Sequence, residues 1–461
     1  MPPHDDGPAD PLDLPEYRPG GTAVLTDIER WPTLDSAGLA ELTRWRDHAH
    51  APRWTHATGD RMTAEGAASA ARPLPLDGWL DDHLAVARRL IRYRDTTGLD
   101  HLADFPTICR DDLMADVAAF VPLDADLGRA VHGSSSGSTG AALVVPDDQE
   151  DNARTFHLLR ALVAEQGVTW DPDPARLALA HVVNQRDAFT YVSLITGFAA
   201  RPMVRINLDH AQWPSTPSRS LFLADADPQV VTGDPTSLEA LLDDDLADAV
   251  RPLALFSGAM ALAAPLRAAL EDRFRCPVID IYGLHETRPI AARADDGPFR
   301  ILGHRIVVEV LGPDGGETPQ GEVGEITVTV GQNPLLPLVR YRTGDFAELV
   351  TMPDGGLGLD RLEGRENTVF AAAGGSRVPC VDLTQHLQAH GARGWVVEQH
   401  EDLSVEAHIA GGDAEAIGKA LARLLGAVPV TVTRVATVAE LGHGKPRRYR
   451  CAVKMGVRGV A

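Results

Sequence analysis

The stretch Val131-His-Gly-Ser-Ser-Ser-Gly-Ser-Thr-Gly-Ala-Ala-Leu-Val-Val-Pro146 gathers glycine, serine and threonine directly before an apolar run. Glycine lets the backbone turn tightly and brings its N–H groups close to a ligand. The hydroxyl side chains add donors without adding charge, so the stretch is suited to polyphosphate oxygens. It is not a Walker P-loop, because no Gly-Lys-Ser/Thr follows at the required spacing. The candidate ligand-binding residues of this loop are Ser135, Ser136, Gly137, Ser138, Thr139 and Gly140.

Two other interpretations of the loop stay open at this point. A serine/glycine run of this kind is often an ordinary turn. Gly133-Ser-Ser-Ser-Gly137 also matches G-x-S-x-G, the nucleophile elbow of serine hydrolases, with Ser135 as the nucleophile. An elbow lies between a strand and a helix, whereas this loop leads into the strand-like run Leu143-Val-Val-Pro146, which argues against it. The loop alone does not decide among these interpretations, so the downstream motifs are needed.

Length and composition limit the possible classes of protein. A chain of 461 residues predicts two or three domains, and 44% hydrophobic and 23% charged residues are ordinary for a soluble globular protein. The formal net charge of −22 disfavours binding to nucleic acid or to anionic membranes. No apolar run approaches the roughly 20 residues that a membrane span needs. The first residues show no secretory signal, so we expect a cytoplasmic protein.

The usual metal and redox motifs are missing from the sequence. The four cysteines are far apart and form no C-x-x-C pair, so reduced thiols are expected rather than a zinc ribbon or a redox centre. His285-Glu286 is not followed by a second histidine at the metalloprotease spacing.

Helices and strands are expected to alternate through the middle of the chain. Residues 1–75 form a poorly patterned lead-in with weakly helical pieces such as Ser36–His48. Hydrophobic periodicity predicts helices at 79–94, 151–166, 236–242 and 262–273, and strands at 177–183, 203–206, 253–257 and 278–282. This alternation predicts an α/β fold with a largely parallel sheet.

The pattern changes twice beyond residue 300. Segments 306–311 and 325–330 alternate around turns such as Pro313-Asp-Gly-Gly316 and predict antiparallel hairpins in a β-rich subdomain. The last hundred residues predict strands at 396–398, 405–409, 430–435 and 448–454 and a helix at 413–425, which together suggest a small α+β domain. With a linker near Gly364-Arg-Glu-Asn367, we expect one domain at 1–363 and a second at 364–461.

Four downstream segments carry residues suited to nucleotide chemistry. Asp280-Ile-Tyr-Gly-Leu-His-Glu286 ends a strand that we expect to be buried; its tyrosine can stack on a base and its glutamate can hold Mg²⁺. Tyr341-Arg-Thr-Gly-Asp345 places a carboxylate just after a tight turn, where it can accept ribose hydroxyls. Arg361-Leu-Glu-Gly-Arg365 starts the linker. Gly442-His-Gly-Lys-Pro-Arg-Arg448 carries a cation on a glycine-flanked loop.

Each segment also has a simpler explanation when it is taken alone. Tyr282 is a reasonable core residue, and Asp345 is a reasonable turn residue paired with Arg342. Lys445 can belong to a solvated basic patch with its neighbouring arginines. The combination, in this order and at these separations, is much harder to explain by chance.

Together these segments resemble the adenylate-forming superfamily of acyl-CoA synthetases, nonribosomal adenylation domains and luciferases, and within it the phenylacetate-CoA ligase-like branch. The resemblance covers about residues 80–450. Its most specific piece is Tyr341-Arg-Thr-Gly-Asp345, and softer agreements lie at residues 102–113, 232–236 and 322–325. It implies a large N-terminal domain, a small mobile C-terminal domain, and attack of a carboxylate on the α-phosphorus of ATP with release of pyrophosphate.

The resemblance also implies roles for individual residues. Asp345 is implied to bind ribose, Tyr282 to lie along adenine, and Lys445 to be the catalytic lysine. Glu286 is implied to handle Mg²⁺, and Arg365 to meet ribose or phosphate. Besides the serine loop, the implied cofactor-binding residues are Ser257, Gly258, Ala259, Tyr282, Gly283, Asp345 and Arg365. The implied catalytic residues are Lys445, His285 and Glu286, with Glu286 also the metal ligand.

The sequence departs from the family pattern at several positions. Ala141 and Ala142 stand where lysine and proline are usual, so pyrophosphate handling is expected to be weaker or shared with another cation such as Arg110. His285 stands at the position of a phosphate-contacting threonine; an imidazole can donate instead, more strongly when protonated. Asn367 occupies the hinge position, which is often aspartate. Residues 184–189 lack the Tyr/Gly-rich pattern of the branch, so phenylacetate is not the expected acid.

These observations predict an ATP- and Mg²⁺-dependent, AMP-forming ligase for a small aryl or similar carboxylic acid, with CoA as the expected acceptor. The partners that the resemblance implies are small molecules, an acid and an acceptor nucleophile, with a homodimer as an open possibility. Transfer to an amine or a carrier protein, and adenylation of an unusual oxyanion, are alternatives within the superfamily. Ala141 and His285 leave a non-catalytic nucleotide-binding relative open, although Glu286, Asp345 and Lys445 argue against it. A serine hydrolase using Ser135 is the remaining alternative class.

Overall fold

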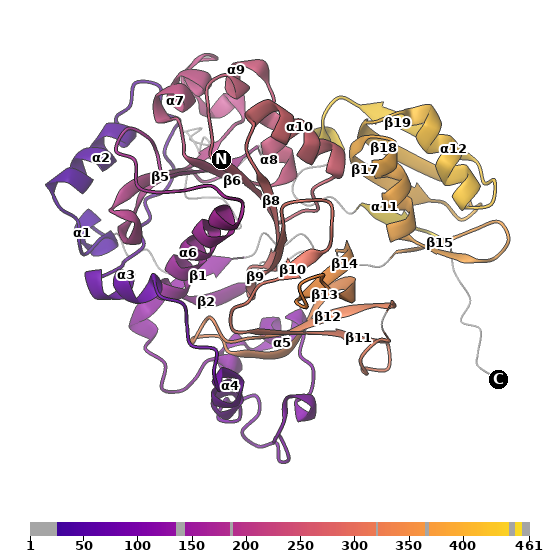
Figure 1. Ribbon diagram of the computed structural model, residues 1–461, viewed down its shortest axis with the longest axis horizontal. Helices are drawn as coiled ribbons and strands as arrows, with labels where there is room; N and C mark the ends of the chain where they lie inside the picture. Colours follow the sequence, from indigo (N-terminus) through magenta and orange to yellow (C-terminus); the bar gives the residue numbers. More distant parts are fainter. Residues whose placement is uncertain are drawn as a thin grey trace, which may run out of the picture.

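The computed structural model describes residues 25–134, 143–184, 188–319, 321–364, 368–441 and 448–453. A twelve-stranded sheet with helices on both faces forms most of the molecule, and a separate four-stranded sheet lies beside it (Figure 1). This arrangement confirms the expected α/β class.

The parallel half of the large sheet carries the strands that the hydrophobic pattern predicts. Its order is β5 (Arg201–Asn207), β3 (Leu179–Val183), β6 (Val230–Gly233), β7 (Ala254–Ser257) and β8 (Val278–Leu284). Neighbours in this run pair in parallel. β3, β5, β7 and β8 lie within two residues of their expected bounds, because apolar runs bounded by turn residues are a strong signal for buried strands. β6 was not predicted. β4 (Tyr191–Ile195) adds an antiparallel edge next to β5.

The antiparallel half continues the same sheet from β8. Its order is β9 (Arg288–Arg293), β10 (Phe299–Ile301), β14 (Leu357–Glu363), β13 (Leu338–Thr351), β12 (Val323–Val330) and β11 (Ile306–Leu311). The predicted pairing of 306–311 with 325–330 is confirmed, since β11 and β12 are antiparallel over six residue pairs. The β-rich part shares one sheet with the parallel part, because β9 turns back directly onto β8.

Helices bury apolar faces on both sides of the parallel half. α6 (Gln149–Glu165) covers one face, where Leu162 and Val163 pack with Leu179 and Phe256. On the other face, the apolar cluster takes residues from α2 (Ser36–Arg46), α7 (Ser218–Ala226), α8 (Pro235–Ala240) and α10 (Ala264–Phe274). The shorter helices are α1 (Asp27–Arg30), α3 (Ala64–Ala70), α4 (Trp79–Ala87), α5 (Arg110–Ala115) and α9 (Asp244–Ala247).

Two expectations from the N-terminal part of the sequence need correction. The described part of the lead-in is packed into the core: Trp31 and Trp45 are each 1% exposed and join the apolar cluster of β3 and β5. The helix expected at 79–94 ends at Ala87. Beyond it, Leu90 and Tyr93 donate their backbone N–H groups to the residues three positions earlier, in successive tight turns. The side chains of Leu90 and Tyr93 are both buried. The apolar residues therefore keep a helix-like spacing in the sequence although the chain forms turns here instead of an α-helix.

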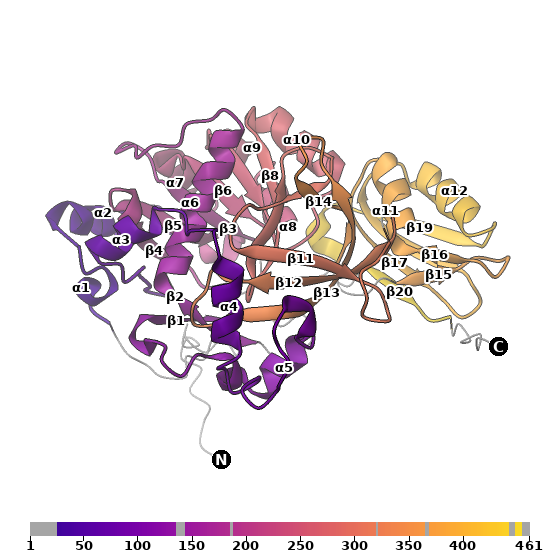
Figure 2. The same ribbon diagram turned by 60° about the horizontal axis from the view of Figure 1, so that its bottom comes forward.

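The C-terminal part has its own sheet and its own apolar cluster. The strand order is β19 (Val430–Val435), β18 (Val405–Gly411), β17 (Ala392–Gln399) and β20 (Tyr449–Cys451). α11 (Cys380–Ala389), α12 (Ala414–Leu424), β15 (Val369–Ala371) and β16 (Arg377–Pro379) complete it. Trp395 and Phe370 are buried within this cluster. In Figures 1 and 2 this part lies beyond α10, with its strands in yellow and orange. A domain boundary at residue 364 stays a prediction.

Candidate active site

The serine loop begins and ends in an antiparallel hairpin. β1 (Ala130–Ser134) pairs with β2 (Val144–Asp148), in register from Ala130 opposite Asp148 to Ser134 opposite Val144. The six candidate residues 135–140, together with Ala141 and Ala142, lie outside the described residues. Because the loop joins two antiparallel strands, it lacks the strand–turn–helix context of a nucleophile elbow. The serine hydrolase interpretation therefore has no support from the fold.

Two predicted motifs meet through a buried hydrogen bond. The hydroxyl of Tyr282, at the end of β8, donates to Oδ2 of Asp345 at 3.0 Å and lies 3.4 Å from Thr343 Oγ1. Tyr282 is 9% exposed and Asp345 is 6% exposed. Gly283 has no room for a side chain, because a Cβ there would lie 2.4 Å from the carbonyl oxygen of Arg288. The fold thus brings together side chains that are 63 positions apart in the sequence.

Asp345 is presented by an irregularity inside a long strand rather than by a turn. The sequence predicts a tight turn before Asp345, and that prediction is wrong, because residues 338–351 form one strand, β13. Glu325 of β12 pairs with Phe346 of β13, and the next pair is Thr327 with Arg342. Between these two pairs β12 covers two residue steps, whereas β13 covers four. Gly344 has a φ of 77°, which accommodates this bulge. Arg342 pairs with Glu325, which removes the suggested Arg342–Asp345 pair.

Glu286 is held by a residue of the same β13 motif. Tyr341 donates its hydroxyl hydrogen to Oε1 of Glu286 at 2.5 Å, and the carboxylate is 4% exposed. Tyr341 also lies beside Ile108, whose backbone oxygen accepts the N–H of Arg342 at 2.7 Å. Arg110, the cation suggested for pyrophosphate, begins α5 two residues after Ile108. The contact of Ile108 with Tyr341 therefore brings Arg110 close to β13.

His285 belongs to a buried network that links three segments. Its Nε2 lies 3.5 Å from Oδ2 of Asp147, near the end of β2. Arg288 contacts the same carboxylate at 2.8 Å and Asp151 of α6 at 3.1 Å. Burial raises the pKa of Asp151, while the Arg288 guanidinium opposes that rise. Asp147 and Arg288 were not predicted; the signal for Asp147 is a pair of acidic residues directly after the apolar run Leu143-Val-Val-Pro146.

The end of β7 lies beside β8, the strand that carries Tyr282. Ser257 is 1% exposed, and its Oγ has no hydrogen-bond partner among the described residues. Gly258 donates its N–H to the carbonyl of Gly233 at 3.2 Å, and Ala259 has a φ of 66°. On β8 beside Ser257, burial raises the pKa of Asp280 to about 6, against the charges of its arginine neighbours. An unpaired buried hydroxyl at a strand end is suited to a bound polar ligand.

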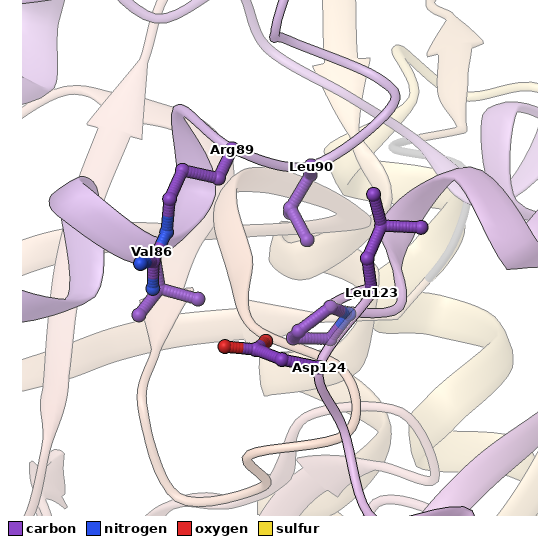
Figure 3. A pocket seen from close by; sticks show the side chains of 6 residues that line it. Val86, Arg89, Leu90, Leu123 and Asp124 are labelled. Carbon is purple, nitrogen blue, oxygen red and sulfur yellow. The ribbon is translucent and has the colours of Figure 1, made fainter.

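Several predicted residues cannot be placed. Lys445, Arg365 and the hinge residue Asn367 lie outside the described residues. No three or more His, Cys, Asp or Glu side chains gather into a metal site within the described ranges. None of the helices in the described ranges is both long and apolar enough to cross a membrane. A separate surface cavity of about 300 Å³ lies between α4 and residues 122–124 (Figure 3) and contains none of the predicted site residues.

Comparison with known proteins agrees with this geometry. Residues 109–333 match the family model described as AMP-binding enzyme. The match covers just under half of the chain and makes it similar to adenylate-forming enzymes. Its curated relatives include the phenylacetate-coenzyme A ligases of Pseudomonas putida, 28% identical over 56% of this chain, and of Escherichia coli, 26% identical over 64%. The chain matches only 59% of the length of the Pseudomonas ligase and 70% of the Escherichia coli ligase.

Solved structures of adenylate-forming enzymes share the fold. A 2-hydroxyisobutyryl-CoA ligase in complex with its acyl adenylate superposes with a TM-score of 0.61, at 15% identity, over 84% of this chain and 90% of that chain. An open conformation of the ligase, with acyl adenylate and CoA, superposes with a TM-score of 0.51. At this identity the likeness concerns the fold alone, and the chemistry has to be argued from the site residues.

Proposed function

We propose that this chain is an ATP-dependent, AMP-forming ligase that adenylates a small, preferably aryl, carboxylic acid and transfers the acyl group to CoA. The observation that carries the proposal is the Tyr282–Asp345 hydrogen bond of 3.0 Å, which joins the two most informative motifs in one buried place. The names of the similar ligases support an acid as substrate and CoA as acceptor.

The proposed chemistry has two half-reactions. In the first, a carboxylate oxygen of the acid attacks the α-phosphorus of ATP, the bond to the pyrophosphate oxygen breaks, and an acyl adenylate forms. In the second, the thiolate of CoA attacks the acyl carbon and AMP leaves. Such reactions depend on positioning and charge neutralisation more than on covalent chemistry by the protein.

The described residues offer groups for the nucleotide. Asp345 is assigned to the ribose hydroxyls, because its carboxylate is fixed by the bulge and by Tyr282. Tyr282 is assigned to the face of the adenine, and the unpaired Ser257 hydroxyl and the Gly258 backbone to nearby polar groups. His285, whose ring lies next to the Asp147 carboxylate, is assigned to the α-phosphate. From the sequence alone we assign the β- and γ-phosphates to residues 135–140, with Arg110 as the supporting cation.

Magnesium is compatible with the residues that are present. Among the described residues, Oε1 of the buried Glu286 carboxylate accepts the Tyr341 hydrogen bond, and the second oxygen is proposed to face a ligand. Mg²⁺ commonly takes one or two carboxylates together with substrate phosphates and water, so a site without a cluster of acidic residues fits. When bound, the ion would neutralise phosphate charge.

The products of ATP test the proposal. With a suitable acid and Mg²⁺, the protein should convert ATP to AMP and pyrophosphate, and CoA should then yield a thioester. A screen of aryl, aliphatic and amino acids, with and without CoA, measures pyrophosphate release and thioester formation separately. Formation of ADP and phosphate would contradict the proposal. Adenylate formation without thioester would favour an amine or carrier-protein acceptor.

A further inference from the structure

A row of polar side chains crosses the parallel half of the sheet near the ends of its strands. Arg205 of β5 lies in register with His181 of β3, and His181 lies in register with Thr232 of β6. Paired residues of neighbouring strands point to the same face of a sheet. That face is the one covered by α6, because Leu179 and Met203, two residues before His181 and Arg205, pack in its apolar cluster. The row is therefore a polar interruption of an otherwise apolar face.

Arg205 is a cation without a carboxylate partner among the described residues. Its guanidinium carbon lies 3.7 Å from the centre of the Phe189 ring. Its Nε is buried and has no hydrogen-bond partner in the described part of the chain. A stacked guanidinium keeps its N–H donors at the edge of its plane, where they suit a planar anion. In a chain with net charge −22, a half-buried arginine with no carboxylate partner among the described residues points to an anion from outside the chain.

Two histidines extend the site without adding charge. Burial, and then the charge of Arg205, lower the pKa of His181 to about 3, and its Nδ1 lies 2.8 Å from Thr232 Oγ1. Burial lowers the pKa of His56, and the Arg205 charge lowers it further. The His56 ring lies 4.9 Å from that of Phe189, and its Nδ1 is buried without a partner among the described residues. Both rings are therefore neutral at pH 7, and Arg205 supplies the positive charge.

The row leads toward the candidate active site. Thr232 is followed by Gly233, whose carbonyl accepts the N–H of Gly258 at the end of β7. Strands lie about 4.8 Å apart, so Arg205 on β5 is roughly 10 Å from β6 and about 14 Å from β7 at the level of the backbone. A long arginine side chain shortens that distance. An elongated acid with its reacting carboxylate near Gly258 can therefore reach Arg205 with its far end.

We propose that Arg205, supported by His181 and His56, binds a second anionic group at the far end of the acid substrate. The substrate class is then an elongated dicarboxylic acid, preferably with an aryl body that can pack near Phe189. This inference rests on the proposed function, because the position of the first carboxylate comes from it. It goes further by naming the charge and length of the acid.

Matched acids and matched variants test the proposal. Phenylacetate and 4-carboxyphenylacetate differ only in the second carboxylate, and pyrophosphate release gives kcat/KM for each. We expect the dianion to be preferred at least tenfold, the scale of one charge-assisted hydrogen bond. Arg205→Gln should remove that preference, and Arg205→Lys should retain part of it. Arg201→Gln is the control, because Arg201 lies on the same strand but pairs with Glu41 at 3.3 Å, away from the row.

A binding measurement separates this proposal from the proposed function. Without ATP, 4-carboxyphenylacetate should raise the melting temperature of the wild type and of Arg201→Gln, but not that of Arg205→Gln. Stabilisation that depends on Arg205, without AMP formation from any acid, would support the anion site and contradict the ligase function. AMP formation from both acids at equal kcat/KM, unchanged in Arg205→Gln, would overturn the anion site and leave the ligase function intact. If neither acid were preferred and the dianion gave no Arg205-dependent stabilisation, the proposal would also be overturned.

Discussion

His285 replaces a hydroxyl residue of the family pattern with a larger ring, and Asp147 lies 3.5 Å from that ring. A carboxylate at this place fixes the orientation of an imidazole. We predict that Asp147→Asn lowers the rate of adenylation about tenfold. In a His285→Thr background the same change should cost little, because Asp147 is expected to act through the His285 ring, which is then absent. Pyrophosphate exchange for the four proteins of this cycle is the measurement.

Asp151→Asn is the matched control for that cycle. Asp151 shares the Arg288 partner, at 3.1 Å, but lies outside the Asp147–His285 pair. Its substitution should therefore lower stability without depending on residue 285. If Asp147→Asn were equally harmful with threonine and with histidine at position 285, the positioning role of Asp147 would be wrong.

Lys445 is assigned to the charge that develops between the carboxylate and the α-phosphate. A lysine acts there as a point charge and needs no fixed geometry. We predict that Lys445→Ala lowers adenylation by roughly 10²–10³-fold, the usual scale for removal of one such group. ATP binding, measured by calorimetry, should change little, because Asp345 and Tyr282 remain. Adenylation at the wild-type rate would rule out this assignment.

The bulge in β13 positions Asp345, and Gly344 makes the bulge possible. At a φ of 77°, a side chain at this position is strained. We predict that Gly344→Ala lowers the free energy of unfolding by about 1–2 kcal/mol and weakens ATP binding, because the carboxylate that we propose for the ribose moves. Gly375→Ala is the control: its φ is 79°, but it lies in the turn between β15 and β16. A similar loss of stability with unchanged ATP affinity is expected for the control. Equal ATP affinity in both variants would contradict the role of the bulge.

Trp45 anchors α2 on the sheet face opposite α6. Its ring is 1% exposed and packs edge-on against Phe222 of α7. We predict that Trp45→Ala lowers the free energy of unfolding by about 3–5 kcal/mol, as large-to-small changes in cores do. Leu39 lies on the same helix and is 48% exposed, so Leu39→Ala should cost well under 1 kcal/mol. Denaturant unfolding of both variants measures the difference. Similar losses would mean that α2 is not part of the core.

The accuracy of the sequence-based predictions differed between kinds of element. β7 and β8 were predicted because buried parallel strands are continuous apolar runs that need no information from distant residues. The bulge at Asp345 was missed, because it depends on the pairing register between β13 and β12. In the sequence alone, a glycine before an aspartate is typical of a turn. The same reason applies to Asp147: its position in the sequence suggests a helix cap, and only the fold brings Arg288 and His285 to it.

At the scale of the whole molecule, polar contacts join the C-terminal part to elements of the large N-terminal part, at residues that flank 442–447 in the sequence. Glu239 of α8 accepts the backbone N–H of Val438 at 2.7 Å and lies 3.1 Å from Arg393 of β17. Arg448 donates to the carbonyl of Ala261 at 2.7 Å. Val438 precedes residues 442–447 in the chain, and Arg448 follows them. These contacts therefore hold Val438 against α8 and Arg448 against the segment between β7 and α10.

Such contacts should favour one arrangement of the two parts over others. The Glu239 carboxylate is 8% exposed, and burial raises its pKa, while the Val438 N–H and Arg393 oppose that rise. If the C-terminal part changes orientation between the half-reactions, Glu239 stabilises only one of them. We predict that Glu239→Ala changes adenylation and acyl transfer unequally, by severalfold in their ratio. Pyrophosphate exchange measures the first half-reaction, and thioester formation from preformed acyl adenylate measures the second.

Glu239→Gln separates the two contacts of this side chain. An amide oxygen still accepts the Val438 N–H, but the attraction to Arg393 is lost. We expect Glu239→Gln to show a smaller change in the ratio than Glu239→Ala, and Arg393→Ala to resemble Glu239→Gln. Because residues 239 and 393 share one contact, their combined substitution should cost less than the sum of the single changes. Equal changes in both half-reactions for all of these variants would mean that the contacts stabilise the fold as a whole, and would leave an orientation-specific role of Glu239 without support.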